Sequence, residues 1–237
     1  PISKTIFSNT EKLDLGTHCS VRGGFSPQLY RSWAGTSPHR EALAYRLLNQ
    51  LGVPTLKSQM LYVDYVDSEN GRIFGEHRQA FFLEDTTDAA QRLQGVEYYS
   101  VQKTFSNPEK SSRALFHFVQ EATETNQTQV AVMLLFENLI RNNDWKLRVT
   151  QDQPISTFLW NVKIIKLLSL NAYYVLPYDF DLSEAVSGYS RSDENIKYYS
   201  SLVGDEAFVN AVKIYKDKKK DLYQLIRLLP DAYSQRL

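Results

Sequence analysis

The first third of the chain alternates apolar and polar positions, a pattern that predicts strands. Alternation with a period of two places every second side chain on one face, as in a half-buried strand. One helix interrupts it: we expect Ser37 as N-cap, Pro38 in the first position and an end at Leu51, before Gly52. The predicted strands cover residues 12–22, 58–66, 72–75 and 79–84, with a loop over residues 23–37.

The rest of the chain has mainly the wider apolar spacing of helices. Thr86 or Thr87 is expected to cap a short helix that ends near Leu93. Further helices are predicted over residues 108–122, 127–142 and 192–236, the last with a charged face from Lys216 to Asp221, and a strand pair over residues 158–168 and 172–178. This order predicts an α+β fold in two parts. Residues 1–85 hold strands with one helix, residues 86–237 are mostly helical, and the division lies near residues 85–95.

Composition and charge exclude several classes of protein. The 237 residues are enough to bury a sizeable core. The net charge is zero, so no basic field is present to attract nucleic acid or anionic lipid. The longest apolar run, Val130 to Phe136, is too short for a membrane span. Cys19 is the single cysteine, which excludes an internal disulfide and a cysteine zinc cluster. Because the chain begins at Pro1, we expect it to be a processed or truncated piece.

Three polar residues in a row end the most apolar helix. Asn142, Asn143 and Asp144 are poor helix formers and good turn formers. On their own, they are equally explained as a helix C-terminus that leads into a turn. Asn161 then interrupts an apolar strand, where a buried amide needs partners or costs about 1–3 kcal/mol. It could support a bend of the backbone or bind a cation.

Two carboxylates follow the second strand of the pair. Asp179 and Asp181 flank Phe180, and in extended geometry they share one face. Their mutual repulsion at the end of a buried strand would be offset by Mg²⁺, which prefers oxygen ligands and usually takes one or two carboxylates plus substrate phosphates. A solvated strand end is the alternative. The order of Asp144, Asn161 and Asp179 supplies the groups that phosphoryl transfer needs.

Glu41 on the first helix is a further candidate. It shares a face with Ala44, Tyr45 and Leu48, so its carboxylate lies on the apolar stripe and needs a cationic partner. A first-turn Glu that is favoured by the helix dipole is the alternative.

These residues resemble those of the spore-coat protein H (CotH) type of atypical protein kinases, and most closely an uncharacterised bacterial group related to it. Three stretches carry the resemblance: residues 40–54, residues 60–66 with 81–85, and Asn143-Asp144 through Asn161 to Tyr178-Asp-Phe-Asp181. The resemblance implies a two-lobed protein-kinase-like fold, with an N-terminal lobe that could be incomplete in this chain, and a cleft for ATP and Mg²⁺.

The resemblance also implies roles for individual residues. Asp144 would be the catalytic-loop Asp, and Asn161 and Asp179 the metal ligands with Asp181 as an auxiliary. Glu41 would be the helix Glu that pairs with the phosphate-binding Lys. Lys12 is the available candidate for that Lys, although the true one could precede Pro1. Residues 81–85, ending in Glu84 and Asp85, would form the hinge beside the adenine.

The chain departs from the kinase pattern in its loops. No glycine-rich phosphate loop is present, because Gly23-Gly24 is too short to form one. Trp160 stands where a His often precedes the Asn. Asn161 follows Asp144 by seventeen positions, whereas the usual kinase spacing is five. A hairpin insertion could absorb the difference.

The function predicted is an ATP- and Mg²⁺-dependent phosphotransferase whose acceptor, a protein or a small molecule, is open. The alternative is a catalytically inactive kinase-like module that binds proteins. The histidines of the sequence do not have the paired spacing of a zinc site, and the sequence has no Gly-x-Ser-x-Gly motif of a serine hydrolase. A glycosidase would have only Asp179 and Asp181 in its favour. Phosphoryl or nucleotidyl transfer, the oligomeric state and the compartment are open, with export favoured over the cytoplasm because relatives of this type are often exported.

Overall fold

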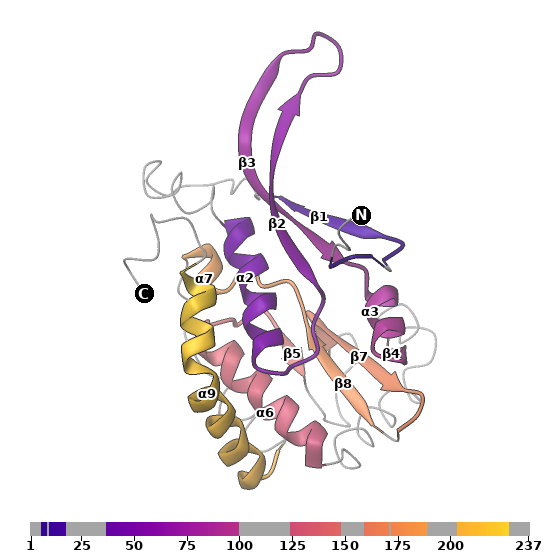
Figure 1. Ribbon diagram of the computed structural model, residues 1–237, viewed down its shortest axis with the longest axis vertical. Helices are drawn as coiled ribbons and strands as arrows, with labels where there is room; N and C mark the ends of the chain where they lie inside the picture. The colour runs from indigo at the N-terminus through magenta and orange to yellow at the C-terminus, as the bar shows by residue number, and fades with distance from the viewer. Residues whose placement is uncertain are drawn as a thin grey trace.

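The protein combines helices with small antiparallel sheets (Figure 1). The computed structural model describes residues 6–8, 10–17, 37–99, 124–147, 159–170, 172–188 and 203–227. One sheet has the strand order β1-β3-β2, a second has the order β4-β7-β8, and β5 pairs with β6. The α+β class predicted from the sequence is therefore confirmed for this part of the chain.

The elements occur along the chain in the following order. They are β1 (Leu13–Thr17), α2 (Ser37–Gln50), β2 (Ser58–Val66), β3 (Ile73–Glu84), α3 (Thr86–Arg92), β4 (Gly95–Tyr99), α6 (Glu124–Leu139), β5 (Lys146–Leu147), β6 (Leu159–Trp160), β7 (Val162–Leu167), β8 (Tyr173–Pro177), α7 (Glu184–Ser187) and α9 (Asp205–Ile226).

The first helix ends as the sequence predicts. Gly52 has φ +83° and follows the last turn of α2. Its N–H donates to the Asn49 carbonyl, and the Val53 N–H donates to the Leu48 carbonyl, both within 3.1 Å. These two bonds form a Schellman motif, in which a residue in the left-handed region satisfies the last carbonyls of a helix. The predicted strand over residues 58–66 is confirmed with both its ends.

Several predicted boundaries are wrong, for identifiable reasons. Residues 72–75 and 79–84 belong to one strand, β3, because a positive φ at His77 and shifts of register absorb the polar interruption. Asp85, and neither threonine, caps α3, since its carboxylate accepts the Thr87 N–H at 2.8 Å. The strand expected over residues 158–168 is divided at Asn161 into β6 and β7.

The ends of the helices also differ from the prediction. Helix α6 stops at Leu139 rather than at residue 142. Within the helix predicted over residues 192–236, α9 runs from Asp205, with Gly204 as its N-cap, to Ile226, and residues 192–202 and 228–236 of that prediction lie outside the described residues. Strand β4 was not predicted, and it pairs with β7. The predicted helix over residues 108–122, residues 18–22 of the first strand, and Cys19 lie outside the described residues.

A continuous core joins the two parts of the chain. Buried apolar side chains from α2, β3, α3, α6, β7, β8 and α9 belong to one cluster. Helix α2 packs against β2 and β3 on one side and against α7 and α9 on the other. The division into lobes at residues 1–85 and 86–237 stays a prediction. Within the described residues, none of the helices is at once long and apolar enough to cross a membrane.

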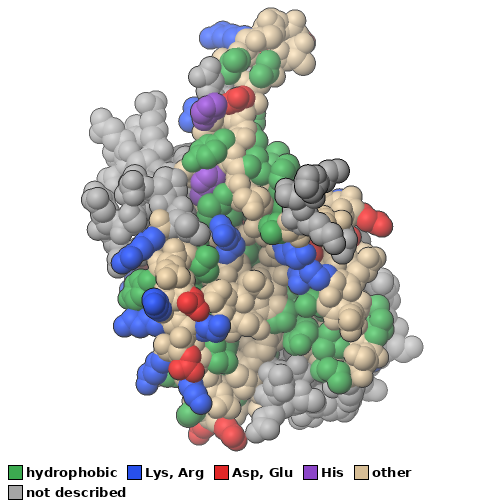
Figure 2. Space-filling model, in the orientation of Figure 1, with side chains coloured by type: hydrophobic (Ala, Val, Ile, Leu, Met, Phe, Trp, Pro, Cys, Tyr) green, Lys and Arg blue, Asp and Glu red, His purple; other side chains and the backbone are tan. Residues whose placement is uncertain are grey.

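The β2–β3 hairpin projects from the body of the molecule (Figure 1). Hydrophobic side chains gather along it in the space-filling view (Figure 2), and Tyr62, Val66 and Ile73 each expose at least half of their surface.

The first sheet packs tightly at the base of this hairpin. Gly16 faces Phe81 across the β1–β3 pair, and the Phe81 ring occupies the place where a Cβ on Gly16 would lie.

We predict that Gly16→Ala lowers the free energy of unfolding by about 1–3 kcal/mol, the usual cost of overpacking. The new methyl group must displace the ring of Phe81, which is 3% exposed. Urea unfolding of the single variants and of the double variant Gly16→Ala/Phe81→Leu measures this. The loss on Gly16→Ala should shrink in the Phe81→Leu background. Equal losses in both backgrounds would show that the ring is not the obstacle.

Candidate functional site

The loop that carries Asp144 begins at the end of α6. Arg141 has φ +50°, and its N–H donates to the Asn138 carbonyl at 3.1 Å while the Asn142 N–H donates to the Glu137 carbonyl at 2.8 Å. This is again a Schellman ending, but with Arg in the place that usually holds Gly. The turn that the sequence suggested for these residues is therefore present. The Asn142 side-chain oxygen then accepts the Asp144 N–H at 3.0 Å, which fixes the backbone at Asp144.

Asn161 is brought directly against Asp144. Its side-chain Nδ2 donates to the Asp144 backbone carbonyl at 2.7 Å and to Asp144 Oδ2 at 3.1 Å. Asn161 is 6% exposed and has φ +53°. Its own carbonyl accepts the Tyr178 N–H at 3.0 Å. Because both Nδ2 protons serve Asp144, the side-chain oxygen of Asn161 is the atom left to act as a ligand.

The Asp-Phe-Asp segment follows β8 and inserts its aromatic ring into the core. Phe180 is fully buried, with its ring centroid 4.9 Å from that of Tyr45 and 6.1 Å from that of Phe136. Asp179 has φ +62°, a conformation that non-glycine residues adopt at a cost. The buried ring thus leaves Asp179 and Asp181 on the outer side, where Asp179 is exposed.

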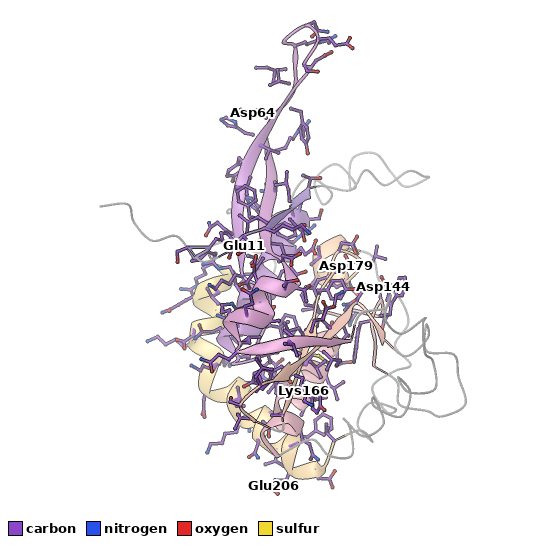
Figure 3. The ribbon with its side chains drawn as sticks, turned by 90° about the vertical axis from the view of Figure 1, so that its right-hand side faces the viewer. Glu11, Asp64, Asp144, Lys166, Asp179 and Glu206 are labelled. Atoms are coloured by element: carbon purple, nitrogen blue, oxygen red, sulfur yellow. The ribbon has the colours of Figure 1, made fainter. Side chains whose placement is uncertain are left out.

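These two carboxyl groups interact with each other. Partial burial of the Asp179 carboxyl group, the charge of Asp181, a hydrogen bond shared with Asp181 and the charge of Asp144 together raise the pKa of Asp179 to about 6. A hydrogen bond between two carboxyl groups needs a proton on one of them. Asp144 and Asp179 lie close together in Figure 3, in agreement with this electrostatic contact.

Glu41 reaches the same group of carboxylates from α2. It lies beyond the first turn, so the helix dipole does not explain it. Burial, together with the charges of Asp179 and Asp181, raises its pKa to about 8, against hydrogen bonds from the Phe180 N–H and the Tyr45 hydroxyl. The Tyr45 hydroxyl also accepts the Asp179 N–H at 3.0 Å. Tyr45 therefore joins Glu41 to the Asp-Phe-Asp segment.

The structure thus gathers five of the seven predicted site residues, namely Glu41, Asp144, Asn161, Asp179 and Asp181. Among the described residues, no three His, Cys, Asp or Glu side chains are arranged so that they could hold a metal ion on their own. A cation here would need oxygen ligands from elsewhere, such as the Asn161 amide or the phosphates of a substrate.

Lys12 and Glu84 lie in separate ion pairs. Lys12 Nζ pairs with Asp85 at 3.2 Å, and this lysine side chain is 69% exposed. Glu84 is almost fully buried and takes two hydrogen bonds from Arg92, at 2.8 and 2.7 Å, together with the Lys57 N–H at 3.0 Å. The Glu84 side chain therefore has a structural role in holding α3 against the sheet. The proposed roles of both residues in binding a cofactor stay predictions.

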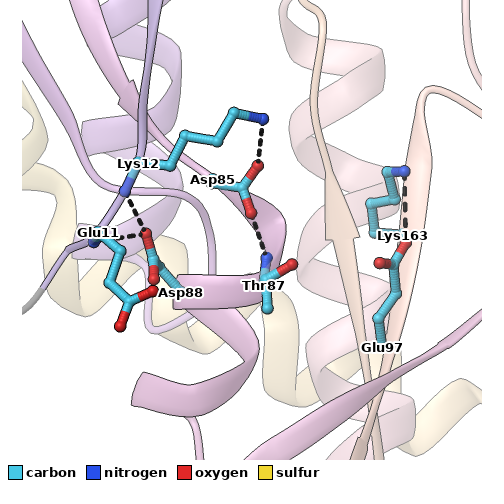
Figure 4. Close-up of polar contacts among 7 residues, drawn as sticks. All are labelled: Glu11, Lys12, Asp85, Thr87, Asp88, Glu97 and Lys163. Atoms are coloured by element: carbon cyan, nitrogen blue, oxygen red, sulfur yellow. Dashed lines mark hydrogen bonds and ion pairs between the residues drawn. The ribbon is translucent and has the colours of Figure 1, made fainter.

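Two further residues near the site were missed by the sequence analysis. Tyr45 was assigned only to the apolar stripe, although a buried tyrosine hydroxyl needs a partner and could have been suspected on that ground. Lys163 pairs with Glu97 at 3.4 Å (Figure 4), and its Nζ lies 5.4 Å from the centre of the Tyr178 ring. No sequence signal marked Lys163, because both contacts depend on the pairing of β4, β7 and β8.

The sequence matches no described protein family, and no curated protein matches it either. The predicted relation to the CotH type therefore has no support from these comparisons. Among solved structures, the chain is similar to the Helicobacter pylori proinflammatory kinase CtkA. The TM-score is 0.41 and the identity is 11%, over 83% of this chain and 74% of that one.

We predict that Tyr45→Phe lowers the free energy of unfolding by about 1–3 kcal/mol, because Asp179 and Glu41 each lose a hydrogen-bond partner. Urea unfolding at neutral pH measures the loss. The matched control is Tyr62→Phe, whose side chain is 56% exposed, and which should change stability by less than about 0.5 kcal/mol. An equal effect of the two substitutions would mean that the Tyr45 hydroxyl does not tie α2 to the site.

Proposed function

We propose that the chain is a kinase-like phosphotransferase that binds ATP and Mg²⁺ at Asn161, Asp179 and Asp181, with Asp144 beside them to orient the acceptor. The observation that carries the proposal is the pair of hydrogen bonds from Asn161 to Asp144, together with the position of Asp179 beside them. Residues that lie seventeen and thirty-five positions after Asp144 meet it in one place. Their types are those that phosphoryl transfer requires.

The ligand chemistry suits Mg²⁺. The side-chain oxygens of Asn161 and Asp179 are hard ligands, and Mg²⁺ is usually held by one or two carboxylates plus substrate phosphates rather than by a cage of protein groups. That mode of binding does not require three acidic or His ligands, which the described residues do not group together. When bound, the ion would neutralise charge on the phosphates, and it would relieve the repulsion that raises the pKa values of Asp179 and Glu41.

Asp144 is placed to orient a nucleophile. Asn161 holds Oδ2 of its carboxylate, and Asn142 holds its backbone N–H. The carboxylate therefore has a fixed direction, and its other oxygen can accept the proton of an attacking hydroxyl group. Holding a reacting group in one orientation is the main protein contribution to phosphoryl transfer.

A specific observation favours the second candidate, an inactive kinase-like module that binds proteins. In a working kinase site the helix Glu pairs with a phosphate-binding Lys. Here Glu41 is surrounded by Asp179 and Asp181, while Lys12 pairs with Asp85. The two candidates differ in whether nucleotide binds, so a binding measurement separates them.

We predict that ATP with Mg²⁺ raises the melting temperature of the protein by several degrees. Ligand at a hundred times its Kd stabilises by about 2.7 kcal/mol, and each kcal/mol corresponds to about 2–4 °C in a chain of this size. Asp179→Ala should abolish the shift, and chelation of Mg²⁺ should do the same. Asp217→Asn, on the exposed face of α9, is the control and should keep the shift. If the melting temperature of the wild type does not change, and that of a version extended upstream of Pro1 does not change either, the inactive module is favoured.

We predict that Asp144→Asn lowers phosphate incorporation by about 10²- to 10⁴-fold, the usual contribution of a general base. The thermal shift with ATP and Mg²⁺ should remain, because Asp144 is assigned to the nucleophile. Label from γ-labelled ATP should enter the product and label from α-labelled ATP should not, as phosphoryl transfer requires. A parallel loss of binding and incorporation, or no loss of either, would overturn the role given to Asp144.

A further inference from the structure

A second buried carboxyl group lies behind the Asp144 loop. Glu137, in the last turn of α6, is 1% exposed, and neither of its side-chain oxygens has a hydrogen-bond partner in the described part of the chain. The group has no assigned part in the proposed chemistry. Its neighbour Phe136 packs against Phe180, so Glu137 lies one residue from the contact that anchors the Asp-Phe-Asp segment.

Asn142 is the polar side chain that acts on the pKa of this carboxyl group. Asn142 is 3% exposed, and its Nδ2 has no hydrogen-bond partner within the described residues. The backbones of the two residues are already joined, since the Asn142 N–H donates to the Glu137 carbonyl at 2.8 Å. The Asn142 amide also acts to lower the pKa of Glu137, in agreement with two buried side chains that lie next to each other.

We propose that Glu137, as a neutral carboxylic acid, is a positioning residue for the Asp144 loop. One of its oxygens accepts a hydrogen bond from Asn142 Nδ2, and this contact turns Asn142 Oδ1 toward the Asp144 N–H that it holds at 3.0 Å. The order of contacts is then Glu137 to Asn142, Asn142 to Asp144, and Asp144 to Asn161. The link to catalysis rests on the proposed function, whereas the state of Glu137 and its hold on Asn142 do not.

The surroundings of Glu137 favour the neutral form. Burial raises the pKa of Glu137 to about 8, with the nearby Asn142 amide acting in the opposite direction. The titratable group that faces it from α9 is Tyr215. The Tyr215 hydroxyl donates to the Val132 carbonyl at 3.2 Å, so its proton already has an acceptor. Among the described residues, the groups that act on Glu137 include no cation, so an ionised Glu137 would be an unpaired charge in the core of that part of the chain.

Amide hydrogen exchange at Asp144 tests the contact directly, without any assumption about activity. The variants are Glu137→Gln, which mimics the neutral acid, and Glu137→Leu, which removes the acceptor at similar size. At pH 6 we expect Asp144 in Glu137→Gln to exchange within about twofold of the wild type, and in Glu137→Leu at least tenfold faster. Amides in the middle of α6, such as that of Val132, should be unchanged. Equal exchange at Asp144 in all three proteins, or loss of protection throughout α6, would overturn the proposal.

The pH dependence of stability provides a test that needs only the conservative variant, in case Glu137→Leu does not fold. A carboxyl group whose pKa is raised in the folded state gives stability that is present at low pH and is lost as the pH rises from the unfolded value near 4.5 to about 8. Glu137→Gln lacks this loss. Its melting temperature relative to the wild type should therefore increase steadily from pH 5 to pH 8, while that of Asp217→Asn should not. A constant difference for Glu137→Gln would overturn the neutral state of Glu137.

Steady-state kinetics then test the link to catalysis. If the wild type transfers phosphate, Glu137→Leu should lower kcat by about tenfold with KM for ATP unchanged, and Glu137→Gln should restore kcat. An unchanged kcat in Glu137→Leu would overturn the link. A wild type without any transfer would overturn the proposed function instead, and the exchange and pH measurements would still decide whether Glu137 holds Asn142.

Discussion

Burial of the Phe180 ring is the contact on which the geometry of the site depends. The ring lies between Tyr45 of α2 and Phe136 of α6, and Tyr45 in turn lies 6.3 Å from Phe81 of the first sheet. Aromatic pairs at such distances have preferred angles, so they restrict rotation as well as translation. The sheet, both helices and the Asp-Phe-Asp segment are thereby held in one arrangement. The two carboxylates beside Phe180 have little freedom to move apart.

That arrangement concentrates negative charge where water is partly excluded. Burial raises the pKa values of Glu41 and Asp179, the charges of Asp179 and Asp181 add to the rise at Glu41, and the charge of Asp181 adds to the rise at Asp179. A protein gains no stability from such a cluster, because like charges repel and each loses hydration. Clusters of titratable groups with shifted pKa values are more frequent at functional sites than elsewhere. The helix that carries Glu41 also packs against both parts of the chain, so the cluster is connected through α2 to the first sheet and to α9.

Local signals predicted the elements that depend on local interactions. Gly52 marks the end of α2 because a residue with positive φ must stand there, and the strand β2 follows from its alternation. The sequence also identified Asp144, Asn161 and Asp179 as one set, which the structure brings together. It offered a bend at Asn161 only as one of two alternatives and did not predict that the strand divides there, since the left-handed conformation of that residue is maintained by contacts with Asp144 and Tyr178. Nor did it predict β4 or the Lys12–Asp85 pair, whose partners are more than sixty positions away along the chain.

Three non-glycine residues around the site, Arg141, Asn161 and Asp179, have positive φ angles. Each conformation costs free energy that glycine would not require. Glycine at these positions would remove that cost, but at Asn161 and Asp179 it would also remove the amide and carboxylate oxygens of the site. Stability and chemistry make opposite demands on the same backbone positions. Any engineering of this protein toward heat resistance should hold these three positions fixed and seek its gains on the projecting hairpin or along α9.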